Sequence, residues 1–390
     1  MTPFGRAIRS RFLLEPETVF LNHGSFGTVP KDVFAVADEV RRRFEANPDR
    51  FIRETLPGGI RQAAARMAEF VRARPEDMTF VDNATAGANT VLRALDFQPG
   101  DEILTTTHAY GAVLNAIRYV ASRTGAKVVE APVPMPAGSA DAIFGPIAAG
   151  FTARTKLLAI DHITSATAMI FPVERLTALA RQHGVRVMID GAHAPGHLPL
   201  DVPAIGADWY FGNCHKWLFS PRGCAFFWAA PEAQKLIHPL SISHGYGKGF
   251  LEEFDWTGTR DPSPVFAVPA GIDFLRALGE ARVRDHNRAL ALAAGQKIAQ
   301  RWGEPMNAAP DLLGAMVGVR LPERWQKAGS ATREAARALT IAVGKRDRIM
   351  LNIMPFGGAL WCRVSAQVYN EIGDYDGVVA FAEKDPPPLG

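Results

Sequence analysis

A lysine and an aspartate in the middle of the chain are the residues best suited to chemistry. An apolar run (187–189) ends in Asp190, and Lys216 follows an aromatic stretch (209–211) with Trp217 directly behind it. In parallel sheets, ligands bind at the carboxyl ends of strands, so an aspartate at such an end faces the active-site crevice. A buried lysine has a lowered pKa, which frees its amine to attack an aldehyde. Taken singly, Asp190 could be a helix cap and Lys216 a surface charge; together they predict a site.

A third segment offers a place for a phosphate. The stretch 82–88 (DNATAGA) follows a short apolar run (79–81) and leads into a helical stretch (90–95). Backbone N–H groups and the helix dipole at a helix start both favour an anion. Small residues such as Ala84 let the anion approach the backbone, and Thr85 adds its hydroxyl. The alternative for this segment is a simple N-cap.

The elements that must position these residues alternate along the middle of the chain. The predicted strands are 102–106, 127–130, 156–161, 185–190, 209–211 and 225–228, with helical stretches such as 112–122 and 174–182 between them. This alternation predicts an α/β fold with a mainly parallel sheet wrapped by helices.

An irregular stretch, 241–264, divides the chain and is expected to be a long functional loop. Beyond it we expect helices at 265–278, 281–302 and 331–343, and strands at 315–321 and near Ile349 and Trp361. The predicted organisation is therefore an N-terminal segment (1–20), a large α/β domain (21–264) and a small α+β domain (265–390).

Composition limits the kind of protein. With 390 residues, 47% hydrophobic and 21% charged, the chain is expected to be a soluble, globular, cytoplasmic protein, because it has no membrane-length apolar run and no secretory signal. A net charge of +3 with interspersed signs argues against nucleic acid and favours a small-molecule partner. The three cysteines fit no zinc pattern, so we expect reduced thiols and no metal site.

Several short motifs in order resemble one enzyme family. Asn83-Ala84-Thr85, His108, 190–193 (DGAH), His215-Lys216 and Gly258-Thr259 are similar to the class V aminotransferase family, which uses pyridoxal phosphate (PLP). The strings at 21–27, 213–217 and 363–370 resemble its isopenicillin N epimerase-like branch. The resemblance spans about residues 20 to 375. It implies a fold-type I PLP-dependent transferase, with a mainly parallel, seven-stranded-type sheet in the large domain and a smaller α+β C-terminal domain.

The resemblance also implies roles around the cofactor ring. Lys216 would hold PLP as a Schiff base, and Asp190 would keep the pyridine nitrogen protonated. His108 would stack on the ring, with Tyr110 as the competing candidate. His193 stands where many desulfurases carry a glutamine near the phenolic oxygen. Ser165 falls at a polar position near the same oxygen, with helix capping as an equal alternative.

Other positions match the phosphate and substrate contacts of the family. Asn213, His215, Thr85 and the backbone of Ala84 would form the phosphate cradle. Thr259 would reach the phosphate of a partner subunit, which predicts a homodimer with shared active sites. Arg363 would bind the α-carboxylate of an amino-acid substrate, because a guanidinium fixes a carboxylate in position and orientation. Asn22 or His23 would touch the substrate.

The resemblance to the epimerase-like branch predicts removal of an α-proton and epimerisation. A C–S lyase or an aminotransferase of the same family is the alternative. Persulfide-forming desulfuration is not expected, because 343–356 contains no cysteine. A nicotinamide-dependent oxidoreductase is disfavoured, because the only glycine-rich approximation, 245–249, has the wrong spacing and context.

Overall fold

A seven-stranded sheet forms the centre of the molecule. The computed structural model describes residues 3–327 and 331–387. The sheet order is β2-β8-β7-β6-β5-β3-β4, and β8 alone runs antiparallel to its neighbours. The strands are β2 (Met78–Val81), β3 (Glu102–Thr106), β4 (Lys127–Ala131), β5 (Thr155–Asp161), β6 (Arg186–Asp190), β7 (Trp209–Asn213) and β8 (Ala225–Ala229). The predicted mainly parallel sheet is confirmed.

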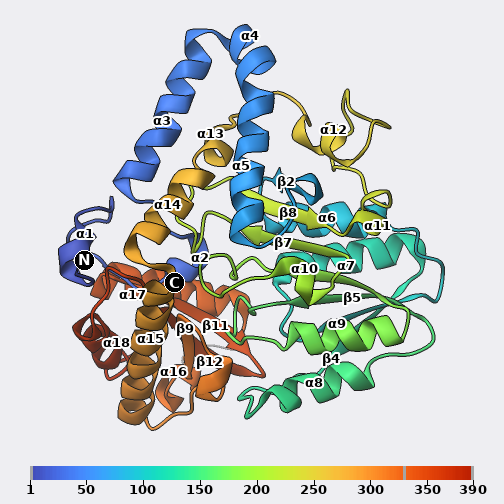
Figure 1. The fold of residues 1–390 in the computed structure, drawn as a ribbon. Helices are drawn as coiled ribbons and strands as arrows, with labels where there is room; N and C mark the ends of the chain where they lie inside the picture. The colour runs from blue at the N-terminus through green and yellow to red at the C-terminus, as the bar shows by residue number, and fades with distance from the viewer. Residues whose placement is uncertain (1–2, 328–330, 388–390) are drawn as a thin grey trace.

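Helices cover both faces of this sheet (Figure 1). On one face α6 (Ala84–Ala94) packs with α7 (Gly111–Thr124); the other carries α8 (Ala140–Ala149), α9 (Val173–Gln182) and α10 (Val202–Ile205). The chain moves outward from β3 to β4 and then returns past β3 to β5. Ligands of α/β sheets bind at such a reversal, outside the carboxyl ends of the strands. The ends of β3 and β5 are therefore where a site is expected.

A helical layer from the first part of the chain lies beside β2. It consists of α3 (Lys31–Ala46), α4 (Pro48–Arg50), a π-helical turn (Phe51–Thr55) and α5 (Leu56–Phe70), joined by α13 (Ser263–Phe266) and α14 (Val268–Leu278). On α5, Ile60, Ala64 and Met67 are buried at helical spacing. The segment 265–278, expected to open the small domain, thus packs on helices of the N-terminal part.

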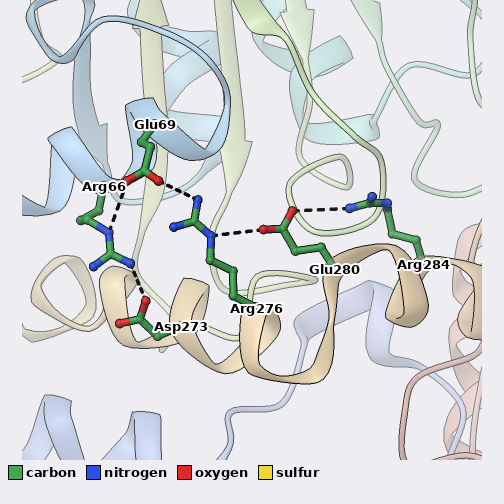
Figure 2. A network of polar contacts seen from close by, with 6 residues as sticks. All are labelled: Arg66, Glu69, Asp273, Arg276, Glu280 and Arg284. Carbon is green, nitrogen blue, oxygen red and sulfur yellow. Dashed lines mark hydrogen bonds and ion pairs between the residues drawn. The ribbon is translucent and has the colours of Figure 1, made fainter. Parts of the chain in front are cut away.

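A chain of ion pairs connects α5, α14 and the next helix, α15 (Glu280–Trp302) (Figure 2). Glu69 lies 3.0 Å from Arg276, and Arg276 lies 3.2 Å from Glu280. Arg66 pairs with Asp273 across the same interface. Because these side chains are partly exposed, each pair contributes about 1 kcal/mol or less. The buried face of α14 contributes more to this interface than the charges do.

The small domain is built on a three-stranded antiparallel sheet, in the order β11-β12-β9. Its strands are β9 (Met316–Arg320), β11 (Asn352–Phe356) and β12 (Ala359–Ser365), and its helices are α15, α16 (Glu323–Lys327), α17 (Arg333–Asp347) and α18 (Asp376–Phe381). The N-terminal segment joins this domain, since β1 (Val19–Phe20) pairs in parallel with β10 (Ile349–Met350). The following short helix, α2 (His23–Phe26), therefore lies where the two domains meet (Figure 1).

Several helices were not predicted from sequence, among them α3 and α5, and two others show why. The stretch 241–264 contains α12 (Phe250–Asp255), which is held by contacts of Phe250 and Phe254 with Phe227 of β8. Such a helix depends on partners distant in sequence and shows little period of its own. The other is α8, whose pattern is interrupted by Pro146. None of the helices in the described ranges has the length and apolar character needed to span a membrane.

Candidate active site

A cavity of about 560 Å³ opens where the strand ends of the large sheet meet the small domain. Four predicted site residues line it: His108, Ser165, Lys216 and Arg363. His108 follows β3, Ser165 follows β5, Lys216 follows β7, and Arg363 lies on β12. The cavity therefore lies at the reversal of strand order and draws on both domains.

Lys216 is held in a tight loop with its side chain buried. Two glycines press against the backbone of this loop. A Cβ at Gly27 would lie 2.0 Å from the carbonyl oxygen of His215, and one at Gly196 would lie 2.4 Å from that of Trp217. Only glycine fits at either position. Burial lowers the pKa of Lys216 to about 8, although the charge of Asp190 partly opposes this shift.

His193 is the direct side-chain partner of Lys216, with its Nε2 lying 3.0 Å from Nζ. On the other side of the ring, Trp217 Nε1 donates to His193 Nδ1 at 3.4 Å. Because an indole N–H can only donate, Nδ1 must accept, and the proton of the neutral ring is on Nε2. Burial and the charge of Lys216 hold the pKa of His193 well below its usual value, so the ring is neutral. His193 thus presents an N–H donor, as a glutamine amide would.

Two buried carboxylates lie behind Lys216. Asp161 ends β5, Asp190 ends β6, and the two are directly paired in register. Burial, together with the charge of Asp190, raises the pKa of Asp161 well above its usual value. Burial also raises the pKa of Asp190, but the backbone N–H of Ala192, at 2.9 Å, and the Lys216 amine stabilise its charge. Asp190 is therefore the more acidic member of the pair, because its charge is better stabilised.

His108 is a neutral ring with both nitrogens engaged. Its Nε2 donates to the carbonyl of Val133 at 3.0 Å, and its Nδ1 lies 2.7 Å from the hydroxyl of Thr167. One ring face stacks on Phe356, with 4.1 Å between centroids. Burial lowers the pKa of His108 to about 4. The ring is suited to stacking and not to proton transfer, whereas the competing residue, Tyr110, is 45% exposed and also lines the cavity.

The start of α6 offers free donors for a phosphate. The N–H of Ala84 donates to Asn213 Oδ1 at 2.9 Å, so the backbone group assigned to the phosphate from sequence is already used. The N–H and hydroxyl of Thr85 have no hydrogen-bond partner within the described ranges. Unpartnered N–H groups in the first turn of a helix bind phosphate well. Asn213 thus fixes the helix start, and half-buried His215, 3.2 Å from the carbonyl of Cys224, stands beside Lys216 in the chain.

Arg363 is a buried cation without an acidic partner. It is 2% exposed; its Nη2 donates to Asn22 Oδ1 at 3.0 Å and to Ser25 Oγ at 2.7 Å, and its Nη1 donates to the carbonyl of Ser165. Its Nε is buried and has no partner. Burial lowers the pKa of Arg363 to about 10. An uncompensated buried guanidinium favours a carboxylate, and Asn22 and Ser25 orient it.

Ser165 and His23 have surroundings that the sequence did not indicate. Helix capping by Ser165 is excluded, because the next helix, α9, begins only at Val173. His23 is fully buried, with Nδ1 2.9 Å from the Tyr369 hydroxyl and Nε2 2.9 Å from the carbonyl of Lys216. Burial lowers the pKa of His23 to about 3. It supports the backbone of Lys216 and does not line the cavity, which differs from the predicted substrate contact.

The remaining predicted positions lie away from the cavity. Thr259 is exposed and does not line the cavity, and its role toward a partner subunit stays a prediction. Cys214, Cys224 and Cys362 are buried free thiols. Burial raises the pKa of Cys362 far above its usual value, which leaves it unreactive. Among the described residues, no group of three or more His, Cys, Asp or Glu side chains is placed to hold a metal ion.

Three residues of the site were not singled out from sequence. The sequence does indicate Asp161, because its predicted strand ends in aspartate just as that of Asp190 does. The sequence also places Trp217 next to Lys216, but the hydrogen bond that Trp217 donates to His193 depends on the fold. Nothing in the sequence indicated Phe356, because it contacts His108 from another domain.

The described side chains fit pyridoxal phosphate. Lys216 would supply the amine for the aldehyde, Asp190 a carboxylate for the ring nitrogen, and Thr85 unpartnered donors for the phosphate.

Comparisons with known proteins agree with this arrangement. The family model "Aminotransferase class-V" matches residues 20–374. A putative L-cysteine desulfhydrase of Oryza sativa subsp. japonica is 39% identical over 77% of this chain and 67% of its own length. An isopenicillin N epimerase of Amycolatopsis lactamdurans is 34% identical over 93% of this chain and 94% of its own. A solved variant of the protein C-DES, with glycine covalently linked to its PLP cofactor, superposes with a TM-score of 0.80 at 20% identity, covering 97% of this chain and 99% of that one.

Proposed function

The chain belongs to the class-V aminotransferase family and is a PLP-dependent enzyme of fold type I, and we propose that it is a C–S lyase acting on L-cysteine or a cysteine derivative. In this reaction the Cα–H bond and the Cβ–S bond break. The sulfur leaves as a thiol or as hydrogen sulfide, and the remaining three-carbon unit is hydrolysed to pyruvate and ammonia.

Each of these cavity residues has its own role in the proposed reaction. Bound PLP supplies an electron sink for the charge left on Cα. Arg363 binds the α-carboxylate, oriented by Asn22 and Ser25. Lys216, besides holding the cofactor, accepts the α-proton at Nζ when its amine is free. The same ammonium can then return a proton to the departing sulfur.

The number of available bases favours elimination over epimerisation. Epimerisation requires proton removal from one face of Cα and proton return on the other, which calls for two acid–base groups. Lys216 is the one lining residue with a shifted pKa in the range for proton transfer near neutral pH. His108 has both nitrogens engaged and a pKa of about 4, and His23 lies outside the cavity with a pKa of about 3. Elimination requires only the lysine.

Epimerisation remains the second candidate, supported by the epimerase relative that matches over nearly the full length of both chains. Tyr110 is then the group to consider, because its phenol lines the cavity. A Tyr110→Phe variant separates the two candidates, since a lyase that uses Lys216 alone keeps most of its turnover.

Product analysis tests the proposal. Purified enzyme incubated with L-cysteine is expected to release sulfide, pyruvate and ammonia in equal amounts, and a Lys216→Ala variant is expected to release none. Inversion of the amino acid without pyruvate would overturn the lyase assignment. A persulfide on any of the three cysteines would indicate desulfuration instead.

We also propose a cytoplasmic homodimer. Leu240, Ile242 and Tyr246 are 48%, 58% and 61% exposed in the stretch before α12. Exposed apolar side chains gathered in one segment favour an interface. In this arrangement Thr259, which lies just beyond α12, contacts the partner's phosphate.

A further inference from the structure

The charges around the active-site cavity are unbalanced. Three described lining residues are cationic, namely Lys216, Arg333 and Arg363, and none is Asp or Glu. Lys216 is committed to the cofactor and the α-proton, and Arg363 to the α-carboxylate. Arg333 therefore lines the cavity as a cation to which the proposed reaction assigns no role.

Arg333 stands at the first turn of α17 and reaches across to α7. Its guanidinium lies against Gly111, where a Cβ would come within 2.6 Å of Nη2. Any larger residue at 111 would displace the guanidinium from this position. Arg333 is exposed and follows Thr332 and precedes Glu334 in the first turn of α17, but no hydrogen bond or ion pair joins it to another residue in the part of the chain that the structure describes. The first turn of α7 also lacks an acidic residue that could neutralise it.

The surroundings of Arg333 suit a polar group at the end of an apolar linker. Asn115 on α7 and Asn352 on β11 line the same cavity with side chains that form no recorded hydrogen bond within the described ranges. Met354 and Phe356 supply apolar surface. A thioether or methylene chain is compatible with this apolar surface, and an anion would be bound by the guanidinium.

We infer that Arg333 binds a second anionic group of the substrate, and that the preferred substrate is an S-linked cysteine derivative whose departing thiol carries a carboxylate. This inference rests on the proposed lyase function, because it takes the group beyond Cβ to be the leaving group. The α-carboxylate is then bound by Arg363 and the distal carboxylate by Arg333. Free L-cysteine, which lacks the distal group, leaves Arg333 without a ligand.

Binding to the holoenzyme provides the test. The probes are S-carboxymethyl-L-cysteine and its neutral amide, S-carbamoylmethyl-L-cysteine, titrated by the change in cofactor absorbance. The wild-type enzyme is expected to bind the carboxylate about tenfold more tightly than the amide. In Arg333→Gln this preference is expected to fall below about twofold. Arg337→Gln is the matched control, because Arg337, which is exposed like Arg333 and lies one turn further along α17, does not line the cavity; it should keep the wild-type preference.

Two further measurements on the same samples distinguish failure of the inference from failure of the proposed function. The cofactor absorbance of Arg333→Gln shows that the variant is folded and loaded. Pyruvate release reports whether the enzyme is a lyase. A preference for the carboxylate that depends on Arg333 supports the inference even when no pyruvate forms, in which case only the lyase function fails. Equal affinities in the wild type, or an unchanged preference in Arg333→Gln, overturn the inference even when pyruvate forms.

Discussion

Burial controls the protonation state of the titratable side chains around Lys216. It lowers the pKa of the lysine and of the neighbouring histidines, and it raises the pKa of both carboxylates behind them. The result is a lysine that loses its proton more readily than usual, next to a neutral His193 and to Asp190. A lowered pKa makes more of the free amine available as a nucleophile.

The first prediction concerns the pH dependence of Lys216. Because burial lowers its pKa to about 8, the fraction of free amine rises as the pH increases through 8. The rate at which the apoprotein takes up PLP should rise with the same midpoint. In Asp190→Asn the midpoint should move to lower pH, because the aspartate charge raises the pKa of Lys216. A midpoint near that of an ordinary lysine, about 10.4, would contradict the burial argument.

The second prediction concerns the N–H donor of His193. His193→Gln retains a donor and should keep a substantial part of the turnover. His193→Leu removes it and should lower turnover about 10- to 100-fold. Both are measured as kcat together with the absorption maximum of the bound cofactor, which a purely structural role would not shift. Equal loss in the two variants would show that the donor has no special role.

For single residues, the sequence predicted which side chains belong to the site better than it predicted the contacts they make. Lys216 and Asp190 were identified because their types and positions carry chemistry, and Arg363 because it matches a position of the family. The hydrogen bond that Trp217 donates to His193 was not predicted, because it depends on the conformation of the loop that carries Trp217. That the N–H of Ala84 is already used likewise depends on the side chain of Asn213, which reaches α6 from β7.

At the level of elements, the loop that carries Lys216 is fixed by close backbone approaches. Gly27 and Gly196 both have positive φ angles, of 64° and 79°. Both lie against carbonyl groups of residues 215–217. The rigidity of the site thus comes from two other loops, one after α2 and one after β6.

The third prediction tests this packing. Gly196→Ala should destabilise the fold by about 2–4 kcal/mol, because the positive φ angle and the collision with Trp217 add together. Gly247→Ala is the matched control, since its φ of 76° is similar but no atom lies within 4 Å of the new Cβ. It should cost only about 1 kcal/mol. Urea unfolding and cofactor content measure both effects, and similar losses in the two variants would contradict the packing argument.

The strands of the large sheet and the helices α7, α9 and α15 were predictable because their periodicity is local, although α3 and α5 were not predicted. The strands of the large sheet lie within one or two residues of the predicted bounds, as for β5 and β6. By contrast, α12 is held by aromatic contacts with β8, and the placement of 265–278 against α5 is decided by packing between distant segments. Neither is encoded in a local pattern.

At the scale of the whole molecule, both domains and the N-terminal segment are needed to form one site. Arg363 comes from β12, Asn22 and Ser25 come from the segment before and within α2, and Lys216 comes from the large sheet. Relative movement of the domains would therefore change the distance between Arg363 and the amine of Lys216.

The fourth prediction concerns assembly. Ile242→Glu places a charge in the exposed apolar stretch before α12 and should shift the protein from dimer to monomer, with weaker retention of PLP. Ile372→Glu, at a residue 44% exposed near the C-terminus, is the control and should leave both properties unchanged. Sedimentation velocity and cofactor absorbance provide the measurements. A wild-type protein that is monomeric with full PLP occupancy would contradict the dimer.

The fate of the α-proton tests the central claim that one base, Lys216, serves an elimination. The enzyme is incubated in D₂O with L-cysteine, and both the product and the unreacted substrate are analysed by mass and by chirality. The account predicts pyruvate carrying solvent deuterium in its methyl group, with the remaining cysteine still in the L form. Accumulation of D-cysteine labelled at Cα, with no pyruvate, would contradict it.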